Sequence, residues 1–208
     1  RDITAFENQD RVTPPPAHPI VFVGSSTIRF WKVNDAFPGL PVLNRGFGGS
    51  ETADAVYYFD RIVARYQPGI VVFYSGDNDL NAGKSPDEVV ATTREFIDLL
   101  RQRCPNSKLI FIAIKPSIAR WKIIDKMRET NQRTKKRVES YPGGVFVNIE
   151  SQILGDDGKP RTELFRAGDG SYLSLDVWRA REDFDAFMAA HGDDYAALDR
   201  STESWTLS

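Results

Sequence analysis

The sequence contains little cysteine and little histidine, and each shortage excludes a kind of site. The single cysteine, Cys104, leaves no intramolecular disulfide and cannot build a cysteine-based metal centre. Because it precedes Pro105 at the predicted end of a helix, we interpret it as structural. Histidine occurs only at His18 and His191, so chemistry that needs an imidazole has two candidates in the whole chain.

Long apolar runs and an excess of one charge are also absent. No stretch approaches the ~18 apolar residues of a membrane span. The formal net charge of −2 gives no reason to expect nucleic acid or an anionic membrane as a partner. The acidic loop near Asp156 and Asp157 lacks EF-hand spacing, and no Gly-x-Gly-x-x-Gly opens the first helix, so neither a metal nor another cofactor is expected.

The length and composition are those of an ordinary globular domain. With 208 residues, 41% of them hydrophobic, the chain is predicted to form a single domain over 1–208. Residues 1–19, which contain three successive prolines, are interpreted as an extended lead-in. Residues from about 192 to 208 are interpreted as a polar tail.

Apolar strands alternate with helical patterns along the chain. Strands are predicted near 20–24, 42–44, 70–74, 108–114 and 145–148, and helices near 27–37, 52–66, 86–103 and 120–140. This α/β alternation predicts one five-stranded parallel sheet that is covered by helices on both faces. Ligands of such sheets bind outside the carboxyl ends of the strands, where the strand order reverses.

Chemically useful residues follow three of these strands. The first strand ends in Ser25-Ser26, the second leads to Gly48-Gly49, and the third leads to Asn78. A serine nucleophile needs donors that hold the oxyanion, and a glycine N–H and an asparagine amide are suitable. Each feature alone is typical of turns and caps, but the three together favour a serine-based site.

The same three stretches resemble the blocks of the SGNH (GDSL-type) hydrolases. Residues 22–28 resemble the first block, 44–50 the second and 76–79 the third, and the overall resemblance covers about 20–175. Within the family it is closest to bacterial esterases and acetylhydrolases of the platelet-activating-factor acetylhydrolase type. The resemblance implies a flavodoxin-like three-layer α/β/α sandwich and the hydrolysis of esters.

The resemblance also implies roles for individual residues. Ser26, in preference to Ser25, matches the nucleophile. The oxyanion hole would consist of the backbone N–H groups of Ser26 and Gly49 and the side-chain amide of Asn78. The neighbours Asp77 and Asp79 are expected to make structural hydrogen bonds.

The last block departs from the family pattern. Asp169 matches the aspartate that orients the base, but Tyr172 stands where the family has its histidine. A phenol with a pKa near 10 is a poor base at neutral pH. His191 would lie ~30 Å away along a straight helix, and His18 precedes the first strand, at the opposite end of the sheet.

Two functions therefore stay open. The first is a serine esterase that acts on short acyl esters of the acetyl type, with acetylated carbohydrate as one candidate substrate. The second is a catalytically impaired relative that binds acyl esters or glycans without efficient turnover. Lys115 and Arg120 follow the fourth strand and are candidate pocket residues. The start at Arg1 and the resemblance to exported esterases favour an exported protein, and nothing in the sequence indicates an oligomeric state.

Overall fold

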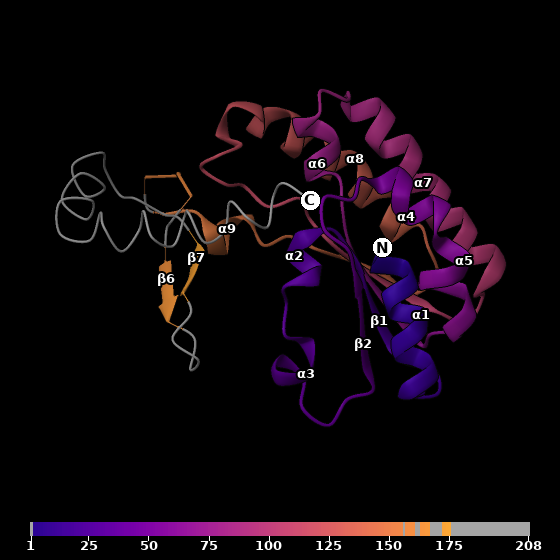
Figure 1. Cartoon of the computed structure of the whole chain (residues 1–208). Coiled ribbons are helices and arrows are strands. Elements are labelled where there is room, and N and C mark those ends of the chain that lie inside the picture. Colours follow the sequence, from indigo (N-terminus) through magenta and orange to yellow (C-terminus); the bar gives the residue numbers. More distant parts are fainter. Residues whose placement is uncertain (1, 156, 161–162, 167–171, 176–208) are drawn as a thin grey trace. The chain divides into compact units, whose positions relative to one another are not determined.

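A computed structural model describes residues 2–155, 157–160, 163–166 and 172–175 (Figure 1). It divides the chain into two compact units, Arg1–Glu150 and Ser151–Ser208. The single domain expected over 1–208 stays a prediction, and the predicted polar tail lies outside the described residues. None of the described helices is both long enough and apolar enough to cross a membrane.

The first unit contains the predicted five-stranded parallel sheet. Its strands are β1 (Ile20–Gly24), β2 (Val42–Gly46), β3 (Ile70–Tyr74), β4 (Lys108–Ile112) and β5 (Gly144–Val147). The strand order is β2-β1-β3-β4-β5, with every pairing parallel. This is the flavodoxin-like order, and its direction reverses between β1 and β3. The site predicted at the carboxyl ends of these strands therefore lies at the topological switch point.

Helices cover both faces of the sheet, which confirms the three-layer α/β/α prediction. On one face, α1 (Asp2–Val12), α4 (Thr52–Tyr57), α5 (Phe59–Ile62), α7 (Pro86–Arg103) and α8 (Ile124–Glu139) share a core with Val21, Val71 and Phe73. On the other face, α2 (Ser26–Arg29) and α3 (Val33–Ala36) cover Phe22 and Tyr74. Figure 1 shows α2 and α3 on one side of the strands and α1, α4, α5 and α7 on the other.

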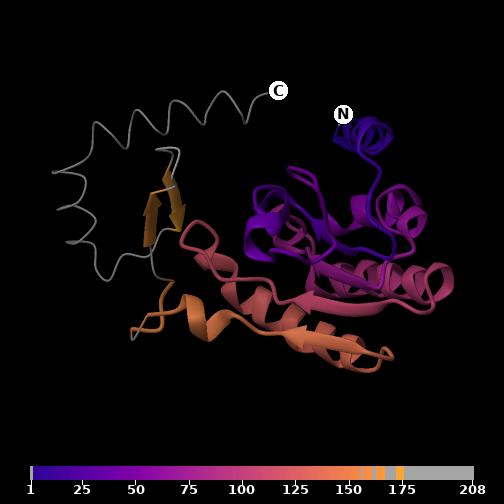
Figure 2. The same cartoon turned by 90° about the horizontal axis from the view of Figure 1, so that it is seen from below.

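The remaining elements are short. In the first unit they are the 3-10 helices η1 (Ala64–Tyr66) and η2 (Trp121–Ile123) and the helix α6 (Asp77–Asn81). Helix α9 (Glu150–Ile153) follows at the boundary between the units. The second unit contains an antiparallel pair, β6 (Glu163–Arg166) and β7 (Tyr172–Leu175), which is visible in Figure 2.

The extended lead-in predicted for residues 1–19 was wrong over residues 2–12, which form helix α1, whereas residues 13–19 contain no helix or strand. Tertiary contacts stabilise this helix. Ile3 is buried in the main core, and Asp10 forms an ion pair with the buried Arg45 of β2.

The single helix predicted over 27–37 was also wrong, because the segment divides into α2 and α3. The side chain of Asn44 explains the interruption. Its Nδ2 donates to the carbonyl oxygens of Ile28 (2.7 Å) and Trp31 (3.0 Å), the groups that a continuing helix would use. The helix predicted over 52–66 is likewise divided, into α4, α5 and η1.

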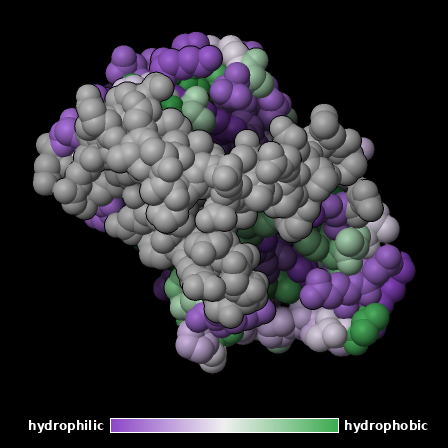
Figure 3. Space-filling model, turned by 60° about the vertical axis from the view of Figure 1, so that its left-hand side comes forward, coloured by the Kyte–Doolittle hydropathy of each residue, from purple (hydrophilic) through white to green (hydrophobic). Residues whose placement is uncertain are grey.

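The described surface is mostly hydrophilic, and most of its large exposed apolar side chains are scattered. Figure 3 shows hydrophilic residues over much of the described surface on one face, with separate hydrophobic patches. Over the whole described surface, the large apolar side chains that are exposed are those of Val12, Phe30, Leu40, Tyr57, Ile118, Val145 and Val147. Apart from Val145 and Val147, which share one face of the edge strand β5, this exposure is scattered, and scattered exposure is normal for a globular protein.

Candidate active site

Strand β1 delivers two serines to the start of a helix. The chain turns at Gly24, where a side-chain carbon would lie 2.2 Å from the carbonyl oxygen of Tyr74, so only glycine fits. Ser25 is the buried N-cap residue of α2, and its Oγ has no hydrogen-bond partner among the described residues. Ser26 is the first residue of α2 and is half-buried, so it is the more accessible of the two hydroxyl groups. Its assignment as the nucleophile stays a prediction.

The loop after β2 carries the predicted glycine donor. Gly49 is exposed and has a φ of 70°, in the left-handed region that favours glycine. No described atom lies within 4 Å of the position that a side-chain carbon would occupy. The backbone at Gly49 is therefore accessible from outside the loop.

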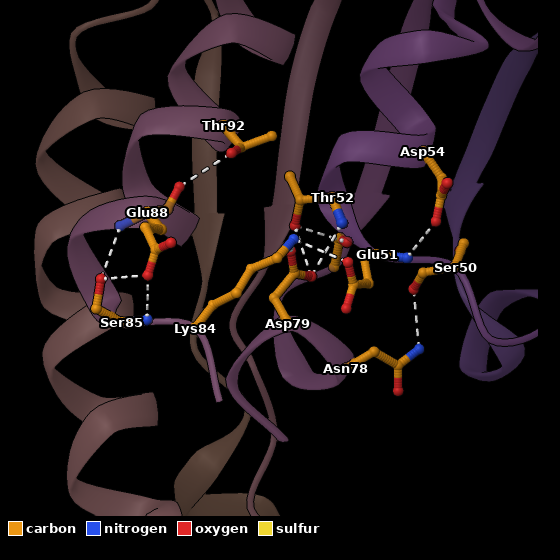
Figure 4. Close-up of polar contacts among 11 residues, drawn as sticks. Ser50, Glu51, Thr52, Asp54, Asn78, Asp79, Lys84, Ser85, Glu88 and Thr92 are labelled. Atoms are coloured by element: carbon orange, nitrogen blue, oxygen red, sulfur yellow. Dashed lines mark hydrogen bonds and ion pairs between the residues drawn. The ribbon is translucent and has the colours of Figure 1, made fainter. Parts of the chain in front are cut away.

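The structure joins this loop directly to Asn78 in α6. The Asn78 Nδ2 donates to the carbonyl oxygen of Ser50 at 2.9 Å, a bond drawn in Figure 4. On its other side, the Asn78 Oδ1 accepts a hydrogen bond from Arg120 at 2.7 Å. An amide nitrogen has two donor hydrogens, and the described residues engage one of them. The second is available to a ligand.

A second polar network holds the residues that connect the Gly49 loop to α4. The carboxylate of Asp79 is fully buried and accepts from the backbone N–H of Thr52 (2.9 Å) and from its hydroxyl (3.1 Å). Lys84 pairs with Asp79 at 3.0 Å and with Glu51 at 2.8 Å. Figure 4 shows these side chains converging between α4 and α6. The network ties the residues after Gly49 to the helix that carries Asn78, and it confirms that Asp79 makes structural hydrogen bonds.

Two further ionisable groups lie at the carboxyl ends of β3 and β4, Tyr74 as the last residue of β3 and Lys115 shortly after β4. Burial raises the pKa of Tyr74 well above its ordinary value, and the nearby Asp77 raises it further. Burial lowers the pKa of Lys115, and Arg120 lowers it further, while Asp77 acts in the opposite direction. Lys115 is therefore a partly buried side chain and not a fully solvated one.

Most of the predicted base region lies outside the described residues. Asp169 and His191 lie outside the described residues, and Tyr172 is described only as the first residue of β7 in the second unit. His18 lies before β1, at the opposite end of that strand from Ser26, and its Nδ1 is 3.0 Å from the carbonyl oxygen of Gln67. This position agrees with a structural role for His18.

Sequence reasoning missed how the predicted residues are held together. The sequence marked Arg120 as a candidate pocket residue but gave no sign of its bonds to Asp77 and Asn78. It assigned no role to Thr52 or Lys84. No local pattern identified these contacts, because they join residues that are far apart in the chain.

Comparisons with known proteins identify the family and the fold of the chain. The family model of the GDSL-like lipase/acylhydrolase family matches residues 27–177. The match begins one residue after Ser26 and spans Gly49, Asn78, Asp169 and Tyr172. No curated protein sequence matches the chain.

Solved structures with low sequence identity share the fold. A protein of Streptococcus pneumoniae described as a platelet activating factor protein has a TM-score of 0.70 at 17% identity, over 92% of this chain and 90% of that one. A GDSL-like lipase of Bacteroides thetaiotaomicron has a TM-score of 0.65 at 18% identity, over 96% and 98% of the two chains. A mutant of an acetyl-xylooligosaccharide esterase of Geobacillus stearothermophilus has a TM-score of 0.51 at 16% identity, over 71% and 89%.

The family-model match covers well over half of the chain, and the strand order and three layers are those expected of this fold. The chain therefore belongs to the GDSL-like lipase/acylhydrolase family.

Proposed function

We propose that the protein is a serine esterase that hydrolyses short acyl esters. Ser26 is the nucleophile, and the oxyanion hole consists of the backbone N–H groups of Ser26 and Gly49 and the side-chain amide of Asn78. The observation that carries the proposal is the hydrogen bond from Asn78 to the carbonyl of Ser50, next to Gly49. It links α6, which carries Asn78, to the loop that carries Gly49, and this link supports a shared oxyanion hole at the switch point after β1.

The reaction follows from these positions. The Ser26 Oγ attacks the carbonyl carbon of the ester, and its proton passes to a base. The hydrogen-bond donors stabilise the negative charge on the carbonyl oxygen. The bond to the alcohol oxygen then breaks, and this oxygen takes the proton from the base. Water attacks the acyl-serine in the same way and releases the acid.

The base is the component on which the proposal depends most. Asp169 would orient a base at the position of Tyr172, but a phenol is protonated at neutral pH and accepts a proton poorly. We therefore expect slow turnover in the wild-type chain. Tyr172 also supports an alternative to an active esterase, namely a protein that binds acyl esters or glycans and hydrolyses them only very slowly.

Acetyl esters of oligosaccharides are the substrate class that we propose to test first. The family acts on acyl esters. One solved structure with this fold is an acetyl-xylooligosaccharide esterase, which makes an acetylated sugar a reasonable alcohol component.

The test is hydrolysis of p-nitrophenyl acetate and of acetylated xylo-oligosaccharide by purified variants. Ser26→Ala is expected to leave only the residual acceleration that the oxyanion donors and binding supply, while the matched control Ser25→Ala keeps the rate within a few-fold. Tyr172→His is expected to raise kcat by about 100-fold or more, because a positioned base contributes 10²–10⁴-fold.

Two results would change the conclusion. Undiminished activity in Ser26→Ala contradicts the nucleophile assignment. If wild type and Tyr172→His are both inactive but calorimetry detects binding of the acetylated oligosaccharide, the binding function replaces the esterase.

A further inference from the structure

Arg120 makes a two-pronged contact with neighbouring residues of α6. One guanidinium nitrogen donates to the Asn78 Oδ1 at 2.7 Å, and the other donates to the Asp77 Oδ2, also at 2.7 Å. Arg120 comes from the segment between β4 and η2, 42 residues from Asn78 along the chain. The contact is partly shielded from solvent, since the side chains of Arg120 and Asp77 are only 25% and 14% exposed.

These contacts select one of the two orientations of the Asn78 amide. The oxygen and nitrogen of an amide have nearly the same shape, so a flipped side chain fits the same space. A guanidinium can only donate, and the carbonyl of Ser50 can only accept. In the flipped form Arg120 would face the amide N–H groups and the Ser50 carbonyl would face the amide oxygen, so both bonds would be lost.

The orientation matters because only the nitrogen of the amide can stabilise an oxyanion. An amide oxygen in the same place would repel the developing negative charge. A charge-assisted bond to the oxygen also polarises the amide, which strengthens the N–H as a donor.

We propose that Arg120 is a positioning residue for ester hydrolysis: it locks the Asn78 amide with its nitrogen toward the oxyanion. This inference rests on the proposed function, since it assigns Arg120 an effect on the transition state and none on the binding of the ground-state substrate.

Two contacts support this position of Arg120. Asp77 neutralises its charge. The side chain of Asn131 on α8 bonds both backbone groups of Ile114, at 2.8 Å to the N–H and 2.9 Å to the carbonyl, and so fixes the start of the segment that carries Arg120. Arginine is suited to this task, because its rigid fork reaches two separate acceptors whereas a lysine ammonium is a single point charge.

The experiment is a double-mutant cycle on the full chain that combines Arg120→Ala with Asn78→Ala. It is measured in the wild-type or the Tyr172→His background, whichever is more active.

Arg120→Ala is expected to lower kcat by about 10- to 100-fold and to leave KM within about twofold. This loss in kcat is somewhat smaller than the 10²–10³ loss that follows removal of an oxyanion donor. In the Asn78→Ala background the same change should have no further effect. Arg120→Lys should retain more activity than Arg120→Ala. The matched control is Arg133→Ala, since Arg133 is a surface arginine paired with Glu129 and Asp87.

A second measurement does not depend on turnover. In 15N-labelled chains, the side-chain amide signals of Asn78 should shift in Arg120→Ala and Arg120→Lys and stay unchanged in Arg133→Ala. If neither background hydrolyses the ester measurably, the cycle is run on the rate at which a fluorophosphonate labels Ser26.

The inference is overturned if Arg120→Ala leaves kcat unchanged, raises only KM, or lowers the rate equally with and without Asn78. Unchanged Asn78 amide signals in Arg120→Lys would also overturn the inference. The lysine variant provides this test even if Arg120→Ala does not fold. These failures differ from failure of the proposed function, which shows as undiminished activity in Ser26→Ala.

Discussion

At the scale of single residues, polar side chains that follow β3 bond both the backbone and the side chains of neighbouring segments. Asn78 bonds the carbonyl of Ser50, and Asp79 bonds the N–H of Thr52. Burial lowers the pKa of Lys84, but its bonds to Glu51 and Asp79 raise the pKa by more, so the ammonium stays charged at neutral pH. The site is therefore shaped by fixed polar contacts that are already present without a ligand.

Asp79→Asn tests how much this network contributes to stability. The substitution keeps the shape of the side chain but removes the charge that faces Thr52 and Lys84 in a fully buried position. We expect the free energy of unfolding to fall by about 2–4 kcal/mol, because a buried charge partner is lost. Denaturant unfolding at pH 7 measures the change.

The matched control is Asp87→Asn. The carboxylate of Asp87 pairs with Arg133 but is 81% exposed, so its loss should change the free energy of unfolding by less than about 0.5 kcal/mol. Equal effects of the two substitutions would show that Asp79 has no special structural role.

At the scale of elements, helix α1 is attached to the sheet through one buried arginine. Arg45 on β2 is 2% exposed, pairs with Asp10 of α1 and donates to the Tyr66 hydroxyl at 2.9 Å. The Tyr66 hydroxyl in turn donates to Asp10 at 2.6 Å. The guanidinium also lies 4.9 Å from the centre of the Phe6 ring. The helix thus supplies both the counter-charge and an aromatic face that Arg45 requires.

Asp10→Ala should therefore destabilise the protein by about 3–5 kcal/mol, because it leaves the Arg45 charge buried without its partner. Chemical denaturation measures the loss, and hydrogen exchange should show faster exchange in α1. Glu7→Ala on the same helix is the control, since Glu7 forms a partly exposed pair with Arg61 at 2.8 Å, and the loss of such a surface pair should destabilise the protein far less. A similar small cost for Asp10→Ala would contradict the buried-pair explanation.

At the scale of the whole molecule, the described apolar cores all belong to the first unit. The two large clusters cover the two faces of the sheet, and a smaller cluster around Leu80 and Met127 lies beside α6. The sheet is also complete within Arg1–Glu150. These residues have what an independently folding unit needs.

We expect a chain that ends at Glu150 to unfold cooperatively and to retain the α/β circular dichroism of the full chain. It lacks Asp169, so under the proposed function it should hydrolyse esters less well than the full chain measured beside it. Thermal unfolding followed by circular dichroism is the measurement. A shortened chain without a cooperative transition would support the single domain over 1–208 that the sequence predicts.

The positions of the strands along the chain and the parallel sheet could be predicted from local sequence, whereas the flavodoxin-like arrangement was implied only by the family resemblance. Strands buried on both faces need uninterrupted apolar residues, and the five strands begin and end within two residues of the predicted ranges. Local sequence indicated that Ser25-Ser26, Gly48-Gly49 and Asn78 follow three strands, and parallel strands bring their carboxyl ends to one edge. The choice of Ser26 and Gly49 and the catalytic roles came from the family resemblance and stay predictions. Asp169 and Tyr172 could be matched only by resemblance, and their place beside Ser26 stays a prediction.

By itself, then, the sequence determined the α/β layers, the parallel sheet and the sheet edge to which the polar residues belong. The reason is that each helix and strand has its own pattern of apolar residues, which is a local property of the segment. Only the tertiary structure decided that residues 2–12 form a helix, which pairs with the buried Arg45. It also decided that Asn44 bonds the carbonyl groups between α2 and α3, and that Arg120 bonds the amide of Asn78. The physical reason is the same in each case. A hydrogen bond or ion pair between side chains tens of residues apart depends on where the folded backbone places them, and it leaves no periodic pattern in either segment.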